Sequence, residues 1–137
     1  MTQNIASDLQ SVDPGPRLAD VRQISDGIQR LAAINTYDAI TASTTQTQAG
    51  GLALRHGISS VTSANASDAV TMPKATPGVL LILANPSGQT IQLFPFLGDK
   101  INAAAINAAV SVATATTSIY ACSVALQWWG GAITNET

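Results

Sequence analysis

Residues 76–96 read TPGVLLILANPSGQTIQLFPF, and this stretch decides the fold class. Apolar residues run without interruption through 79–84, whereas the segment 90–96 has an alternating pattern. Between them, residues 85–88 (NPSG) have the composition of a β-turn with proline at its second position. The unbroken run predicts a central strand buried on both faces, and the alternating run predicts a strand that pairs back on it as a hairpin.

The two-residue period continues on both sides of this stretch. Further short strands are predicted by residues 56–62, 69–73, 109–113, 117–124 and 126–129. Turn-forming residues separate these segments at intervals of about 10 residues, which is typical of antiparallel sandwiches and barrels. The sequence therefore predicts a mainly β fold, a small antiparallel sandwich or barrel, preceded by an N-terminal arm and one short α-helix.

The helix is expected over residues 17–34, after an arm that ends in the turn signal DPGP at 13–16. Its apolar residues fall on one stripe, and four of them repeat at the heptad spacing of three and four. This stripe either packs on the chain's own domain or forms a bundle of identical helices at a symmetry axis. For the second alternative, the candidate oligomer interface consists of Val21, Ile24, Ile28 and Leu31, together with Trp129 from the β-region.

Charge is scarce and unevenly distributed. Only 10% of the residues are charged, against about 25% in an average soluble domain. Eight of the fourteen charged residues lie in residues 1–38, and the other six are Arg55, Asp68, Lys74, Asp99, Lys100 and Glu136. The distribution predicts an arm and helix for attachment or oligomerisation at 1–38 and a β-domain at 39–137. A neutral β-domain surface is easily buried against a copy of itself, because no charge has to be desolvated.

The residue types that carry chemistry are sparse and isolated. The chain has one histidine, His56, and one cysteine, Cys122, and its β-region carboxylates are far apart in sequence. The adjacent pair Asp99-Lys100 is expected to be a solvated turn. We therefore expect no catalytic residues, no metal site and no cofactor. The net charge of −2 argues against nucleic-acid binding, and the longest apolar run is too short to span a membrane.

The doublet Trp128-Trp129 is the single aromatic pair in the sequence. Adjacent residues on a strand point to opposite faces, so one indole is expected in the core and the other outside. The outer indole would pack on a neighbouring subunit or, as the less favoured alternative, stack on a sugar.

A set of short motifs resembles a module common in the particle proteins of tailed bacteriophages. The motifs are residues 72–78 (MPKATPG), 93–95 (LFP), 98–102 (GDKIN) and 127–128 (QW), in that order, within residues 58–129. The sequence departs from the module at Phe96-Leu97, where small residues are expected. The resemblance implies a capsid decoration (cement) protein, a head fibre or another appendage, often a homotrimer, with no catalytic residues.

Composition and resemblance together favour a non-enzymatic virion structural protein. It would decorate the outer surface of the capsid as a homotrimer and stabilise the shell, with itself and the major capsid protein as partners. The candidate capsid contacts are Arg17, Arg22 and Arg30. The alternative is a head-fibre or tail-tip appendage protein that binds the host surface or glycans.

Overall fold

The structure is a computed structural model that describes residues 34–133. The chain divides into two units, Met1–Ile34 and Asn35–Thr137, and we describe the second. The helix expected over residues 17–34 falls outside the described residues apart from its last position. The described part contains ten strands: β1 (Thr36–Thr41), β2 (Leu52–Ala53), β3 (Gly57–Thr62), β4 (Ala69–Thr71), β5 (Leu80–Asn85), β6 (Ile91–Phe94), β7 (Lys100–Ile101), β8 (Val110–Val112), β9 (Thr116–Val124) and β10 (Gln127–Ala132).

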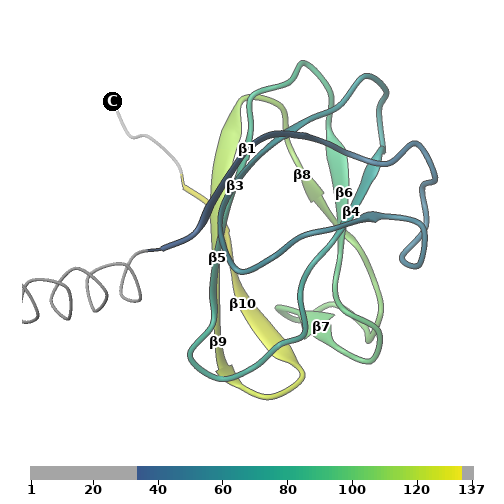
Figure 1. The fold of residues 1–137 in the computed structure, drawn as a ribbon. Helices are drawn as coiled ribbons and strands as arrows, with labels where there is room; N and C mark the ends of the chain where they lie inside the picture. The colour runs from purple at the N-terminus through teal and green to yellow at the C-terminus, as the bar shows by residue number, and fades with distance from the viewer. Residues whose placement is uncertain (1–33, 134–137) are drawn as a thin grey trace, which may run out of the picture. The chain divides into compact units, whose positions relative to one another are not determined.

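From β1 to β9, successive strands alternate between two sheets that face each other (Figure 1). In the six-stranded sheet, of order β1-β3-β5-β9-β10-β7, the first three strands are parallel. In the four-stranded sheet, of order β2-β4-β6-β8, the first three are parallel as well. Each pair β1-β2, β3-β4 and β5-β6 is thus one coil, and the three coils stack as a short β-solenoid.

The predicted antiparallel sandwich or barrel is therefore wrong, although the β-rich character is right. The expected hairpin between residues 79–84 and 90–96 does not form, because the turn at 86–90 carries the chain across to the other sheet. Strand β5 pairs instead with β3 in parallel, where Ile58 lies opposite Ile82. Alternation shows that a strand has a buried face, but it does not show which strand lies beside it. Hairpins and solenoid coils therefore produce the same local pattern.

The core fills the space between the two sheets. In β3, β5 and β6, buried residues alternate with partly exposed ones, so every second side chain points inward. The buried apolar core comprises Ala42, Leu54, Val61, Val70, Met72, Ala75, Leu81, Leu83, Ile91, Leu93, Ile101, Val112, Tyr120, Cys122 and Trp128. Burying each large aliphatic side chain contributes about 1.5–3 kcal/mol, and this stabilises each coil against the next.

Strands β8 and β9 run opposite to the stacked strands and end the parallel pairing. Strand β8 pairs antiparallel with β6, and β9 pairs antiparallel with β5 and β10. The strands at the sheet edges are short or interrupted: β2 and β7 have two residues each, and β1 has a register shift at Ala39, whose φ is 54°. Such edges disfavour the addition of another chain by strand pairing.

Asp99 corrects the expectation of a solvated Asp99-Lys100 turn. Its side chain is 0% exposed, whereas Lys100, the first residue of β7, is exposed. One carboxylate oxygen of Asp99 accepts a hydrogen bond of 2.7 Å from the backbone amide of Ala75. Because neighbouring residues on an extended chain point to opposite sides, only one member of the pair reaches solvent. Asp99 thereby joins the 72–78 segment to the turn before β7.

The buried Asp68 predicts how stability depends on pH. Its Oδ2 accepts hydrogen bonds from the Ser63 hydroxyl at 2.9 Å and from the Asn65 amide at 3.2 Å. Burial raises the pKa of this carboxyl, but the hydrogen bonds lower it by more, so the pKa of Asp68 lies below its ordinary value. The ionised form therefore stabilises the fold above the unfolded-state pKa of about 3.9, and this stabilisation is lost as the pH falls through the folded-state pKa.

We expect Asp68→Asn to lower the thermal midpoint near pH 7 and to have a smaller effect in acid. Circular-dichroism melts of both proteins, at about pH 7 and about pH 3, measure the difference in midpoint. A difference that stays constant or grows in acid would contradict this role of the carboxylate.

Candidate interaction surface

The outer face of the six-stranded sheet carries a row of aliphatic side chains. Ile58 on β3 lies opposite Ile82 on β5, and Ile82 lies opposite Ile119 on β9. The inward neighbours Leu81 and Leu83 are fully buried, so the isoleucines point outward, and Ile119 is 37% exposed. Three consecutive strands of the sheet thus present isoleucine to the outside at one level.

A second row lies one pleat away on the same face. Leu80 on β5 is the register partner of Ala121 on β9, and Ala121 is the register partner of Trp129 on β10. Leu80 is 36% exposed and Trp129 is 52% exposed. The two rows together form an apolar surface that extends from β3 to β10.

We call the outward side chains of β3, β5, β9 and β10 the neutral face, because none of them is charged. By strand alternation its members are Ile58, Ser60, Thr62, Leu80, Ile82, Ala84, Thr117, Ile119, Ala121, Ser123, Trp129 and Gly131. Charged residues occur instead on the two edge strands, Asp38 on β1 and Lys100 on β7, and both are exposed. A partner that covers the middle of the sheet therefore desolvates no charge of this chain.

The two tryptophans have opposite environments. Trp128 is 0% exposed and belongs to the core, whereas about half of Trp129 is accessible on the neutral face. A register shift in the pairing of β10 with β9 lies between Gln127 and Trp129. The expectation that one indole is inside and the other outside is confirmed, while the role of Trp129 in an oligomer stays a prediction.

Two glycines follow Trp129, and each has a different structural role. A Cβ at Gly130 would collide with the backbone of β9, and the Gly130 amide and carbonyl are hydrogen-bonded by the side chain of Asn102 at 3.0 and 2.8 Å. Gly131 is the register partner of Ile119, and a Cβ there would meet nothing within 4 Å. Gly130 thus brings β10 close to β9, and Gly131 leaves room on the neutral face beside Ile119.

The other residues proposed from sequence lie outside the described part of the chain. They are the candidate interface residues Val21, Ile24, Ile28 and Leu31 and the candidate capsid contacts Arg17, Arg22 and Arg30. Their roles, like the division of labour between residues 1–38 and 39–137, stay predictions.

Sequence reasoning found Trp129 but missed the rest of the neutral face. Residues 79–84 were expected to be buried on both faces, whereas Leu80 and Ile82 are at least partly accessible on the outer one. The sequence of residues 117–124 did contain an indication of this face, because uncharged residues occupy both sets of alternating positions there. A strand with one solvated face ordinarily carries polar or charged residues there.

The described residues assemble no cluster of metal ligands. No group of three or more His, Cys, Asp or Glu side chains in this part of the chain could hold a metal ion. No helix among residues 34–133 is long and apolar enough to cross a membrane. The neutral face is therefore the candidate functional surface.

Comparison with known proteins leaves this surface as the main indication of function. No protein-family model, no curated protein and no solved structure matches the chain.

Proposed function

We propose that this chain is a non-enzymatic structural protein of a tailed-bacteriophage virion, a decoration (cement) protein that associates as a homotrimer on the outer surface of the capsid. The observation that supports the proposal most directly is the neutral face, which is apolar at its centre and carries no charge across four strands. The resemblance of the 72–78, 98–102 and 127–128 motifs to phage particle proteins supports the choice of assembly. The major capsid protein is the proposed second partner.

Self-association through the neutral face follows from its chemistry. Ile82, Ile119 and Trp129 would bury apolar area at about 25 cal/mol per Å² against a like surface, and no ionic group would lose its hydration. Aromatic residues are enriched in the cores of protein interfaces and charged residues are depleted there. The short and interrupted edge strands disfavour association by strand pairing. The face, rather than an edge, is therefore the proposed contact.

A charge placed on this face is expected to dissociate the assembly. In Ala121→Glu the new carboxylate stands between Leu80 and Trp129 and would be buried without a partner. Such a charge costs about 2–5 kcal/mol, which weakens association roughly thirty-fold or more. Light scattering on the full chain at micromolar concentration is expected to give three times the 14.0 kDa of one chain for the wild type. The mass of Ala121→Glu is expected to shift toward that of one chain.

Two further variants separate the possible causes of a change in the mass of the assembly. Ser111→Glu places the same charge on β8, an edge strand of the four-stranded sheet, where the residue is exposed, and its mass is expected to stay that of the wild type. Ile24→Asn tests the alternative in which residues 17–34 drive association. A monomeric wild type would contradict the proposed homotrimer. Equal masses for the wild type and Ala121→Glu would show that the neutral face is not the contact.

The appendage alternative is favoured by one observation, the half-exposed indole of Trp129. An exposed aromatic ring can stack on a sugar as well as on a protein. Under this alternative, Trp129→Ala abolishes attachment of the particle to cells and leaves the mass of the assembly unchanged. Under the decoration proposal, the same substitution weakens the assembly itself.

A further inference from the structure

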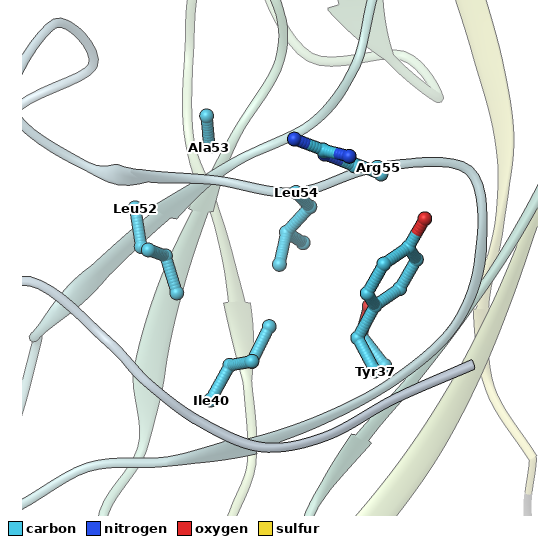
Figure 2. A pocket seen from close by; sticks show the side chains of 7 residues that line it. Tyr37, Ile40, Leu52, Ala53, Leu54 and Arg55 are labelled. Carbon is cyan, nitrogen blue, oxygen red and sulfur yellow. The ribbon is translucent and has the colours of Figure 1, made fainter. Parts of the chain in front are cut away.

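A pocket of about 260 Å³ lies at the end of the solenoid core where the first coil begins (Figure 2). Apolar side chains form much of its wall: Ile40 from β1, and Leu52 and Leu54 from β2 and the segment that follows it. Strands β1 and β2 are the terminal strands of their sheets, so among the described residues no further coil lies against them. The terminal repeats of solenoid proteins require a cap over their apolar interior.

Ser59 places an unsatisfied hydroxyl among the residues that line this pocket. Its side chain is fully buried, and its Oγ has no hydrogen-bond partner among the described residues. The strand register aligns Tyr37, Ser59 and Leu83 at one inward level of successive coils. A leucine at position 59, as at position 83, would fill the space without leaving a polar atom. The serine leaves both volume and a hydroxyl, which costs stability unless something hydrogen-bonds to it.

Arg55 is the only charged residue among those that line the pocket. It is exposed, and in Figure 2 the hydroxyl of Tyr37 points toward the end of the pocket where Arg55 lies. A guanidinium beside a phenol hydroxyl favours a carboxylate, because the guanidinium offers a planar set of N–H donors that matches carboxylate geometry. The pocket thus combines aliphatic walls with one guanidinium group.

The size of the pocket indicates the kind of occupant. At about 30 Å³ per water-sized group, it holds roughly nine such groups, which suits one aliphatic side chain and its neighbouring backbone. Pockets for drug-sized ligands are usually larger, about 300–1,000 Å³. An extended chain passing across the β1–β2 end of the described core fits these dimensions better than a cofactor.

We propose that this pocket binds a segment of a partner protein that presents one aliphatic side chain beside a carboxylate. The aliphatic side chain contacts Ile40, Leu52 and Leu54, the carboxylate pairs with Arg55, and the Ser59 hydroxyl hydrogen-bonds to the segment. This contact lies at the end of the solenoid rather than on the neutral face. It does not depend on the proposed self-association.

The test is a titration of the full chain with the peptide acetyl-Gly-Leu-Asp-Gly-amide, followed by the NMR shifts of the Tyr37, Ala53 and Ser59 amides. Saturable shifts at these amides are expected. The matched peptide with Asn in place of Asp is expected to bind about threefold or more weakly. Arg55→Gln should make the two peptides bind equally. Lys74→Gln, which removes an exposed cation that does not line the pocket, should leave the preference unchanged.

A second variant separates a binding defect from a folding defect. Ser59→Leu is expected to fill the pocket and abolish the saturable shifts with both peptides, while the thermal midpoint stays unchanged or rises. The proposal is overturned if the Asp and Asn peptides bind the wild type alike, or if Ser59→Leu still binds. Tighter binding of hexanoate than of the peptide would overturn it too, since the pocket would then be a site for small carboxylates.

Discussion

Gly130→Ala is expected to prevent folding of the β-domain or to destabilise it by about 4 kcal/mol or more. The φ of Gly130 is +156°, and a Cβ at this position would meet the carbonyl oxygen of Ile119 and lie 2.7 Å from the Cα of Tyr120. These are backbone atoms of β9, which is held on its other side by pairing with β5. Relief therefore requires β10 to separate from β9, which would also break the hydrogen bonds of Gly130 with Asn102.

The neighbouring glycine provides the control for this substitution. A Cβ at Gly131 meets nothing within 4 Å, so Gly131→Ala is expected to leave the thermal midpoint nearly unchanged. Soluble yield and circular-dichroism melts of the two variants measure the contrast. Equal tolerance of alanine at both positions would show that β10 does not approach β9 as closely as the structure has it.

Trp128→Ala is expected to cost about 3–5 kcal/mol of unfolding free energy. The indole is fully buried among the core residues, and β10 pairs at this position with Ile101 of β7. Removing it leaves a large cavity that the two sheets cannot close without moving. The indole N–H has no hydrogen-bond partner among the described residues, so Trp128→Phe removes an unsatisfied donor and is expected to cost less.

Trp129→Ala is the matched control on the same strand. Because about half of this side chain is exposed, its loss is expected to change the unfolding free energy of the single chain only slightly. Urea titrations at low protein concentration measure this quantity without the contribution from association. If Trp129→Ala proved as destabilising as Trp128→Ala, the assignment of one indole to the core and one to the neutral face would be wrong.

Local patterns in the sequence predicted much of the secondary structure. The strand segments at 56–62, 69–73 and 117–124 overlap β3, β4 and β9. Residues 79–84 became a central strand of the larger sheet, but with only one face in the core. The error lies in assuming that the uncharged outer positions of β5 belong to the domain's own interior.

The candidate site was predicted only in part. The low charge of residues 39–137 indicated a surface suited to burial, and the tryptophan doublet indicated one exposed indole. The gathering of Ile82, Ile119 and Trp129 on one face depends on the register between strands up to about 50 residues apart in sequence. The pocket at Ser59 likewise depends on the register with Tyr37 and Leu83, and nothing local to that serine distinguishes it from an exposed one.

The sequence by itself determined that this chain forms short β-strands with alternating faces and that its surface carries little charge. These properties follow from alternation and composition, which are local. Only the tertiary structure decided that β3 pairs with β5 rather than β5 with β6, and hence that the strands wind as a solenoid. The physical reason is that strand partners are chosen by non-local packing of inward faces and by turns that carry the chain across the core. An alternating strand satisfies a hairpin and a solenoid coil equally well.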